Sequence, residues 1–472
     1  MQEELRALRK KPFKERFLGN KDFYKMVLAI VLPIIVQNGI STFVNLLDNV
    51  MVGLIGTEQM SGVSVANNLF FVFNLALFGA MSGVGIFTVQ YYGCGDTNGL
   101  RKTVRFKLWI GLLITVVGIV VLTLFSSQLV NLYLHDESGN GNAEATLQYG
   151  LSYIRIIILS LPAFMIVQVY ASTLRECSET KLPMVAGITA VCTNLLLNYL
   201  LIYGKLGLPK LGVQGAAIAT VISRYVEMLI VVIWAHKHTD RQPWAAKLYQ
   251  SMRVPVKDIK RFTLRGFPLF LNELLWSLGV AMVSQCYSLR GLEVIAATNI
   301  ANNLTQFTNI LTMSMGSAVG IIIGQLLGAG KMIEAKDTDN KLVAFSLMLS
   351  VISTGALLIL APLFPNIYNT TDEIKQLATS FMYVTCVITS FDAFTNVCYF
   401  TLRSGGKTVL TFIFDCVSMW VLMVPVAYVL CHFTALPIVT VYICVNATHI
   451  IKADIGYVFL RRNIWINNIV EE

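Results

Sequence analysis

The sequence predicts an all-α polytopic membrane protein with twelve transmembrane helices in two pseudo-symmetric six-helix bundles. Two observations lead to this fold class: the composition suits lipid, and the first half of the chain is repeated in the second. Of the 472 residues, 55% are hydrophobic and only 13% are charged. An ordinary globular domain carries about twice that charged fraction. The mean hydropathy of +0.65 also favours a chain that lies in a membrane.

The duplication joins residues 33–95 to residues 268–330 without a gap. Identical pairs include Pro33/Pro268, Gly56/Gly291, Glu58/Glu293, Gly85/Gly320 and Gln90/Gln325. VANNL at Val65–Leu69 matches IANNL at Ile300–Leu304, and each Asn pair is expected to face protein, because an unsatisfied amide in hydrocarbon is costly. Soluble repeat arrays have periods of a few tens of residues. Repetition of half a membrane chain is instead typical of transporters, whose substrate site lies between the halves.

Apolar runs long enough to cross a bilayer, about 20 residues each, recur along the whole chain. They lie at 24–47, 60–88, 103–125, 146–172, 183–203, 212–235, 262–288, 294–327, 341–361, 374–402, 408–431 and 437–460. The stretch Ser126–Thr146 is expected to be the longest outward loop. The predicted domains are a cytoplasmic segment 1–23, a first lobe 24–235, a cytoplasmic linker 236–261, a second lobe 262–460 and a cytoplasmic tail 461–472.

The charge distribution predicts the orientation. Most Lys and Arg lie at one set of helix ends, and the alternate ends carry Lys205, Lys210, Arg290 and Lys375. By the positive-inside rule, both termini and the linker are cytoplasmic, in an inner or plasma membrane. The first 25 residues lack the pattern of a removable signal peptide. The net charge of +9 follows from this bias, so we expect the lipid bilayer and small molecules as partners, and no nucleic acid.

The nine cysteines are scattered singly, without a Cys-x-x-Cys pair. This spacing argues against a disulfide framework and a zinc site. We expect no cofactor, no metal beyond a possible Na⁺ ion, no enzymatic activity and a monomeric chain.

Polar residues at membrane depth are costly and are retained mainly for a transport pathway or for structural pairing. Asp48 lies late in the first helix, Asn194 and Asn198 lie four apart in the fifth, and Thr220 lies in the sixth. Together they offer hard oxygen atoms and one charge, which suits a proton or a monovalent cation better than a transition metal. The alternative is structural, with the Asn pair joining two helices and Asp48 at the membrane interface.

The second half holds two further acids at membrane depth. Glu273 lies in the seventh helix and Asp392 in the middle of the tenth, and neither has an adjacent Lys or Arg in sequence. Each could exchange a proton or bind a cationic ligand; alternatively, each hydrogen-bonds a neighbouring helix and stays neutral. Asp415 is interpreted as a structural carboxylate at a helix end, and Lys452 as a side chain that reaches the interface.

Residues that could line a substrate cavity complete the candidates. Aromatic rings contact flat cations through cation–π interaction, although packing against other helices or lipid is the alternative. The substrate-lining candidates are Phe70, Phe73, Tyr170, Gln37 and Asn272. Arg224 and Glu227 are three apart in the sixth helix and are expected to pair with each other.

Four segments carry a resemblance to a known family. They are NLLDNVMVG at Asn45–Gly53, LRECSETKLPM at Leu174–Met184, GVQGAAIAT at Gly212–Thr220, and Trp465 after a basic pair. With twelve helices in two repeated halves, the chain resembles the multidrug and toxic compound extrusion (MATE) family. The resemblance covers essentially the whole chain. It implies a V-shaped pair of six-helix lobes and antiport of organic cations against H⁺ or Na⁺.

The resemblance also implies roles for the polar residues. The family's N-lobe cation site falls on Asp48, Asn194, Asn198 and Thr220, and its C-lobe acids fall on Glu273 and Asp392, as in the NorM-type branch. The DinF-type branch usually has a second N-lobe acid where this chain has the neutral Asn198, so the NorM-type branch is favoured.

Two other functions are compatible with parts of the pattern. A flippase for a lipid-linked oligosaccharide or another amphiphile would need a large cationic cavity, and no cluster of Arg lies at membrane depth. An intramembrane aspartyl protease would need two facing acids with a shared short motif, which Asp48 and Asp392 lack. The sequence therefore favours a secondary multidrug exporter.

Overall fold

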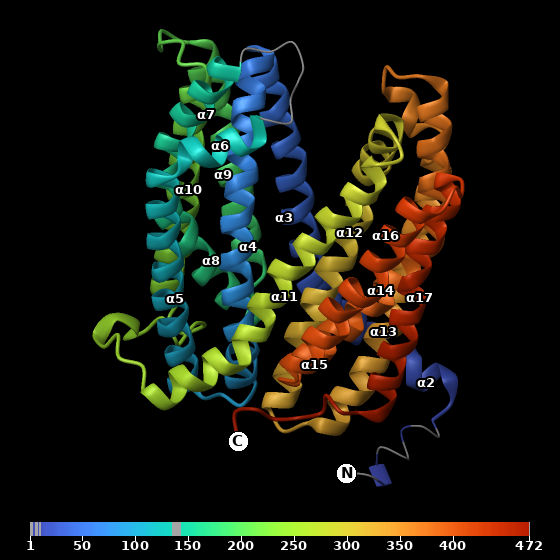
Figure 1. Cartoon of the computed structure of the whole chain (residues 1–472). Coiled ribbons are helices and arrows are strands. Elements are labelled where there is room, and N and C mark those ends of the chain that lie inside the picture. Colours follow the sequence, from blue (N-terminus) through green and yellow to red (C-terminus); the bar gives the residue numbers. More distant parts are fainter. Residues whose placement is uncertain (1–2, 5–7, 9–10, 135–142, 472) are drawn as a thin grey trace. The chain divides into compact units, whose positions relative to one another are not determined.

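The computed structural model describes residues 3–4, 8, 11–134 and 143–471, and the regular elements in these ranges are helices (Figure 1). The α-helices are α2 Phe13–Phe17, α3 Lys21–Gly53, α4 Thr57–Gly93, α5 Thr97–Leu124, α6 Ser126–Leu134, α7 Ala143–Ile157, α8 Leu161–Glu176, α9 Lys181–Tyr203, α10 Val213–Lys237, α11 Val256–Ser288, α12 Leu292–Gly328, α13 Met332–Leu360, α14 Asp372–Ser404, α15 Thr408–Phe412, α16 Val424–Phe433 and α17 Ile438–Arg462. Short 3₁₀ turns are η1 Ile158–Ser160, η2 Leu248–Gln250 and η3 Phe364–Ile367, and π-helical segments are η4 Ile413–Val417 and η5 Met419–Met423.

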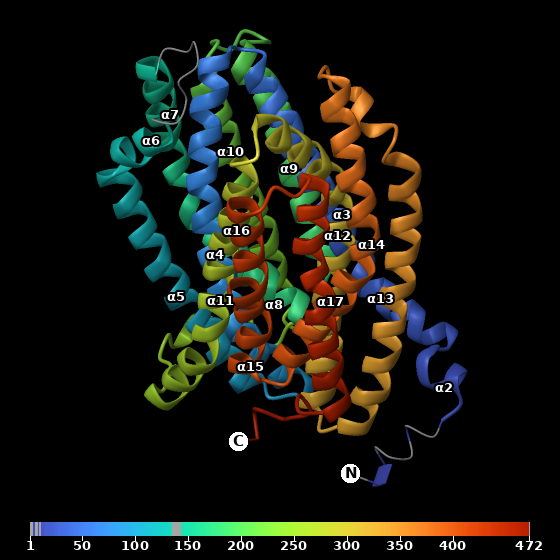
Figure 2. The ribbon, with the colours of Figure 1, turned by 45° about the vertical axis from the view of Figure 1, so that its right-hand side comes forward.

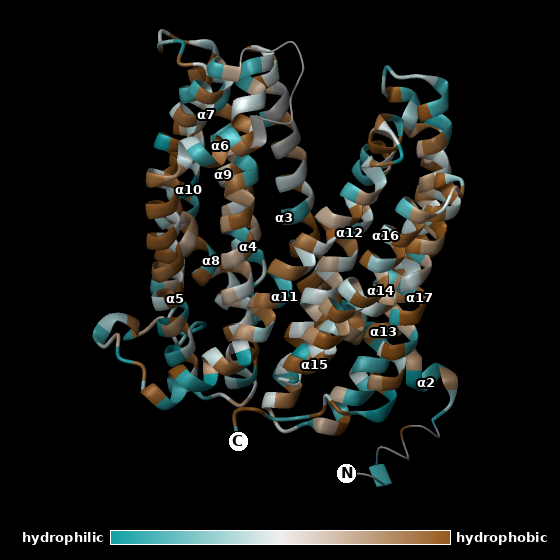
Figure 3. Cartoon of the chain, viewed as in Figure 1, coloured by the Kyte–Doolittle hydropathy of each residue, from teal (hydrophilic) through white to brown (hydrophobic). Residues whose placement is uncertain are grey.

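The predicted fold class is confirmed. In the described part of the chain, 12 helices are long and apolar enough to cross a membrane, and they correspond one to one with the predicted spans. Hydrophobic residues cover most of their length (Figure 3). The expected outward loop Ser126–Thr146 is wrong in part, because α6 occupies its first nine residues; residues 135–142 lie outside the described ranges.

One span is interrupted by a proline. The fourth span joins α7, η1 and α8, and Pro162 is the second residue of α8. Proline lacks an N–H and its ring clashes with the carbonyl of the residue four positions earlier, here Ile158. The chain therefore passes through a tighter 3₁₀ turn before the helix resumes.

The helices form two compact units. Unit 1 comprises Met1–Ile35, Val89–Asp96 and Leu264–Glu472, and unit 2 comprises Val36–Thr88 and Thr97–Thr263. The predicted lobes place the whole first helix in the first half, whereas the contacts divide α3 after Ile35. The physical reason is apolar burial: Val27, Val31 and Ile34 of α3 are buried in the same cluster as residues of α12 and α14.

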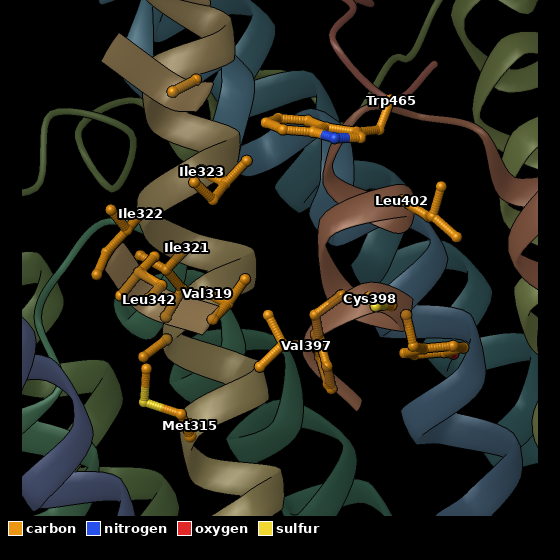
Figure 4. Packing of buried hydrophobic residues seen from close by; sticks show 14 of the residues in the cluster. Met315, Val319, Ile321, Ile322, Ile323, Leu342, Val397, Cys398, Leu402 and Trp465 are labelled. Atoms are coloured by element: carbon orange, nitrogen blue, oxygen red, sulfur yellow. The ribbon is translucent and has the colours of Figure 1, made fainter. Parts of the chain in front are cut away.

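The core of unit 1 is built on neighbouring helices. α12, α13, α14 and α17 run alongside one another in both views (Figures 1 and 2). Met315, Val319 and Ile323 lie along α12, and Val397 of α14 points toward them (Figure 4). Leu402 of α14 belongs to the same buried cluster. Each is at most 1% exposed. Spacings of three and four residues place such side chains on one face of a helix. Trp465, which follows α17, is also fully buried in this cluster.

The ends of the two sequence repeats contact each other reciprocally within unit 1. A Cβ atom on Gly93 would overlap the backbone of Gln325, and a Cβ atom on Gly328 would overlap the backbone of Gln90. Gly93 and Gly328 are equivalent in the duplication, as are the two glutamines. Glycine is therefore required at both positions, because only it lets the backbones approach so closely.

Gln90 adds polar contacts to this approach. Its Nε2 donates to the Ser404 carbonyl at 2.8 Å, and its Oε1 accepts from the Ile469 amide at 2.8 Å. The side chain is fully buried, so these bonds satisfy groups that would otherwise be costly at this depth. The end of α4 thus belongs to unit 1, whereas the rest of the helix belongs to unit 2.

The predicted linker 236–261 has a structure of its own on unit 2. Arg101 and Arg105 of α5 donate to carbonyls of Ala246 and Leu248 at 2.9 and 3.0 Å. Trp244 is fully buried there. Guanidinium groups that bond several carbonyls hold a loop firmly. α11 begins at Val256, inside the predicted linker.

The reciprocal approach predicts that Gly328→Ala destabilises the protein by about 1–3 kcal/mol, because the added methyl group meets backbone that cannot move away. Gly355→Ala in α13 is the matched control, since nothing lies within 4 Å of its Cβ position, and alanine favours the helix. Thermal unfolding of both variants in detergent measures the difference. Equal melting temperatures would contradict the predicted close approach.

Candidate functional site

The four N-lobe candidates form one hydrogen-bonded chain in unit 2. Asp48 comes from α3, Asn194 and Asn198 from α9, and Thr220 from α10. Asn198 Nδ2 donates to Asp48 Oδ1 at 2.7 Å and lies 3.1 Å from the Asn194 amide. With its nitrogen toward the carboxylate, the Asn194 amide donates to both Asp48 oxygens at 3.0 Å and accepts from Thr220 Oγ1 at 3.2 Å. The structure thus brings together residues from three separate sequence segments.

Helix geometry explains how α9 and α10 position this cluster. Asn194 and Asn198 are one turn apart, so they share a face of α9, and both are buried. A Cβ atom on Gly215 of α10 would lie 2.7 Å from the Leu201 backbone. The small residue allows the two helices to pack closely enough for Thr220 to reach Asn194.

The cluster borders a cavity of about 360 Å³ within unit 2. Its polar and aromatic lining includes Asn67, Phe70, Tyr153, Phe164, Arg224 and Glu227, besides the four clustered residues. The predicted Arg224–Glu227 pair is confirmed, with 2.8 Å between Nη1 and Oε2. Arg224 also lies over the Phe164 ring, 5.2 Å from its centroid. The Arg224 charge is thereby compensated, which leaves Asp48 as a carboxylate with amide partners.

Of the substrate-lining candidates predicted from the sequence, Phe70 lines this cavity. Phe73 is 7% exposed and packs 6.3 Å from the Phe164 centroid, outside the lining set. Tyr170 is fully buried, and its hydroxyl lies 3.0 Å from His236 Nε2 and 2.6 Å from the Tyr249 hydroxyl.

Gln37 lies at the start of the part of α3 that belongs to unit 2, and Asp48 lies toward the end of that helix. Its Oε1 accepts from Arg175 Nη1 at 3.4 Å, and its amide nitrogen lies 3.1 Å from the Cβ position of Gly187. These contacts fix Gln37 against α8 and α9. It is not among the residues that line the cavity.

The C-lobe acids lie in unit 1, and each has a partner. Tyr399 of α14 donates its hydroxyl to Glu273 Oε1 at 3.1 Å. Asp392 pairs with His449 Nδ1 of α17 at 2.5 Å, and its side chain is 40% exposed. Asp392 and Tyr399 lie seven residues apart on α14, which is about two helical turns. Neither acid has a Lys or Arg beside it in the sequence. The fold places a partner from another helix next to each, Tyr399 beside Glu273 and His449 beside Asp392.

Beside Glu273, Asn272 belongs to an ion-paired cluster. Asn272 Nδ2 donates to Asp415 Oδ2 at 2.8 Å, and Lys452 pairs with Asp415 Oδ1. The side chains of Lys452 and Asp415 are 16% and 14% exposed. The interpretation of Lys452 as a chain that reaches the interface is therefore wrong: tertiary pairing holds it inside unit 1. Asp415 lies in η4 rather than at a solvated helix end.

Sequence reasoning missed Tyr399 and His449. His449 and Lys452 are three apart in the last span, so they share a face of α17. Two basic residues on one face of an apolar helix were a usable signal for acids on the helices opposite. Tyr399 gave no comparable signal, because tyrosine is common in membrane helices.

The repeated Asn pairs, which are expected to face protein rather than lipid, are not buried by neighbouring side chains. The side chains of Asn67, Asn68, Asn302 and Asn303 are all exposed. Asn67 nevertheless borders the unit 2 cavity, and Asn303 Nδ2 donates to the Tyr368 hydroxyl at 3.1 Å. An exposed amide can reach a polar partner without helix packing around it.

No cluster of three or more His, Cys, Asp or Glu side chains that could hold a metal ion occurs within residues 3–4, 8, 11–134 and 143–471. The oxygen and amide groups around Asp48 can hold a proton, or offer oxygens to a hard monovalent cation.

Twelve spans, a duplicated half and carboxylates at membrane depth define a membrane transporter. The MatE family model matches residues 33–200 and 268–429. The chain belongs to this family, that of the multidrug and toxic compound extrusion transporters, and its members are not enzymes.

Curated relatives carry multidrug resistance names. The chain is 25% identical over 449 residues to "Probable multidrug resistance protein NorM" of Thermotoga maritima, which covers 93% of both chains. It is 26% identical over 428 residues to "Probable multidrug resistance protein YoeA" of Bacillus subtilis, which covers 89% of both. The chain is therefore similar along nearly its whole length to multidrug resistance transporters.

Solved structures match the fold. A crystal structure of MATE in the bent conformation gives a TM-score of 0.84 at 19% identity and covers 98% of both chains. An outward-facing multidrug resistance MATE family transporter of the MOP superfamily gives a TM-score of 0.83 at 19% identity, over 97% of this chain and 99% of that one.

The Asp415–Lys452 pair predicts a stability test. Lys452→Met leaves a buried carboxylate without its cation, so we expect a loss of up to about 3–5 kcal/mol, which the partial exposure of the pair reduces. The double variant Lys452→Met/Asp415→Asn removes both charges and is expected to recover most of the loss. Denaturant unfolding in detergent measures both. A double variant as unstable as the single one would contradict this pairing energy.

Proposed function

We propose that this MATE transporter is a secondary active exporter, which antiports organic cations against H⁺ or Na⁺ by alternating access. The observation that carries the proposal is the Asp48 cluster: one carboxylate, two amides and a hydroxyl border a cavity at membrane depth. An ionised carboxylate at membrane depth is costly unless a partner compensates its charge. Binding of a proton or a cation compensates it, and its release restores the charge.

Coupling requires that ion binding and drug binding influence each other. If an ion at Asp48 lowers the affinity for the drug, thermodynamic linkage requires the drug to lower the affinity for the ion by the same factor. Exchange then needs no direct contact between ion and drug. Two conformations with different affinities for each are sufficient.

Within the family, we place the chain in the NorM-type branch. Three features support this: the neutral Asn198 beside Asp48, the acids Glu273 and Asp392 in the second half, and a relative of that name at 25% identity. Small-molecule organic cations are the proposed substrates.

The C-lobe acids are proposed to bind the cationic substrate or a second ion. Asp392 is 40% exposed and is opposed by His449, whereas Glu273 is held by a neutral tyrosine hydroxyl. A cation that binds Asp392 gains most when His449 is neutral, since a protonated imidazole already compensates the carboxylate.

The proposed setting is an inner or plasma membrane with both termini cytoplasmic. The concentration of Lys and Arg at one set of helix ends supports this orientation. The basic segment 236–261 packs on unit 2 at such an end.

Asp48→Asn tests the coupling site. The change keeps the shape and hydrogen-bonding capacity but removes the charge, so we expect gradient-driven efflux to fall to the level of empty liposomes while the protein stays folded. Drug efflux is measured in proteoliposomes with a proton gradient and a sodium gradient imposed separately, which also identifies the coupling ion. Glu144→Gln, at an exposed acid of the same unit, is the control. Wild-type coupled efflux in Asp48→Asn would refute the proposal.

The double variant Glu273→Gln/Asp392→Asn tests the C-lobe proposal. Loss of charge–charge contacts with a cationic dye should raise its Kd by at least about tenfold, or ~1.4 kcal/mol. Fluorescence titration of the purified variant gives the Kd, and a neutral dye serves as the comparison. Unchanged binding and efflux of the cationic dye would remove these acids from the substrate site.

A further inference from the structure

Another cavity lies within unit 1, at the end of the helices where α13 begins and α17 ends. Its volume is about 360 Å³, and pockets that bind small ligands usually measure about 300–1,000 Å³. α2, α13, α14 and α17 supply its walls, and α2 lies beside α13 in both views (Figures 1 and 2). The residues proposed above for ion or substrate binding are not among the described residues that line it.

The cavity lies at the depth where two apolar spans end. On α13, Val343 belongs to the apolar run 341–361, and Lys336 lies before that run. On α17, Arg461 directly follows the apolar run 437–460. This is the set of helix ends that carries most of the Lys and Arg. Basic pockets between spans at such ends bind the headgroups of anionic lipids.

Positive charge predominates on the wall of the cavity. Its described lining includes one acid and three cations, namely Asp339, Arg16, Lys336 and Arg461. Lys336 already compensates the acid, with 3.1 Å between Nζ and Asp339 Oδ2. The other carboxylate oxygen accepts from Thr401 Oγ1 at 2.9 Å. Because both oxygens of this fully buried carboxylate are used within the protein, an anion in the cavity is attracted chiefly by the two guanidinium groups.

Arg16 holds a donor that the protein itself does not use. Its Nε is buried and has no hydrogen-bond partner among the described residues, although its Cζ lies 4.9 Å from the centroid of the Phe17 ring. A buried donor without an acceptor costs free energy. Guanidinium groups match the oxygens of a phosphate group in geometry and charge. Asn463 Oδ1 is a buried acceptor of the wall in the same condition, and a headgroup hydroxyl can donate to it.

An apolar strip leads from the cavity along α17. Tyr457 lines the cavity, and Ile450 and Ile443 precede it at intervals of seven residues, which is about two helical turns. These three side chains are 54%, 39% and 47% exposed. An exposed apolar strip on a membrane span suits contact with acyl chains. The combination favours a phosphate group that carries a hydrocarbon tail over a free phosphate.

We propose that this cavity binds the phosphodiester headgroup of an anionic phospholipid at the cytoplasmic membrane surface. Arg16 and Arg461 contact the phosphate, and the acyl chains follow the strip on α17. The lipid then connects α2 to α13 and α17, in addition to the Lys11–Asp337 pair at 3.0 Å. Such a site is independent of the transport cycle, because it shares no residue with the Asp48 cluster.

Lipid titration of the delipidated full-length protein, followed by native mass spectrometry, tests the site. The three ligands are phosphatidylglycerol, phosphatidylcholine, which has no net charge, and glycerol 3-phosphate, which has no tail. We expect the first phosphatidylglycerol to bind at least about tenfold more tightly than either of the others, because each basic residue at the membrane surface attracts an anionic lipid.

The double variant Arg16→Gln/Arg461→Gln is expected to lower the affinity for phosphatidylglycerol by about tenfold or more. Lys14→Gln/Arg462→Gln is the matched control. It removes two exposed charges from the same two segments, and neither side chain lines the cavity, so the wild-type affinity should remain. Size-exclusion profiles establish that each variant is folded. If the double variant does not fold, Arg16→Gln alone, on the five-residue helix α2, is compared with Lys14→Gln.

Four results would overturn the proposal. Equal affinities for phosphatidylglycerol and phosphatidylcholine would remove the role of charge. Unchanged affinity without the two arginines would place the lipid elsewhere, and an equal loss in the control variant would reduce the effect to general surface charge. Binding of glycerol 3-phosphate as tight as that of the lipid, and lost in the same variant, would identify a soluble phosphate ester as the ligand.

Discussion

A charge at membrane depth must be compensated within its own helical bundle, because lipid offers neither hydrogen bonds nor counterions. Both units obey this constraint. In unit 2, amides and a hydroxyl surround Asp48, and Arg224 is bound to Glu227. In unit 1, Glu273 faces Tyr399, Asp392 faces His449 and Asp415 faces Lys452, each on another helix. The positions of the polar residues therefore dictate which helices must be neighbours.

Close helix approach makes this compensation possible. Gly215 lets α10 lie against α9, and Gly328 lets the ends of the two repeats meet. Side chains as short as Asn and Thr reach across such contacts, whereas larger residues would hold the helices apart. At Asp415 the backbone itself adapts, since η4 is π-helical, and π-helical turns often occur where a side chain must be redirected.

The two polar clusters differ in how they are compensated, and this difference bears on their roles. The Asp48 carboxylate has neutral partners, so a bound proton or cation changes the local charge fully. Asp392 and Asp415 have basic partners, His449 and Lys452, so a cationic ligand there competes with a side chain already in place. A site with neutral partners suits ion exchange, whereas at a site with a basic partner a cationic ligand must displace that partner from the carboxylate.

Composition, the half-chain duplication and the twelve apolar runs determined the fold class, because a continuous apolar run of about 20 residues satisfies its backbone in lipid as a helix. The sequence also marked Asp48, Asn194, Asn198 and Thr220, since polar residues stand out in apolar runs. It could not show that they touch, that α3 is divided between two units, or that His449 and Lys452 oppose Asp392 and Asp415. Those facts depend on contacts between residues far apart in sequence, and local patterns carry no information about which helix faces meet.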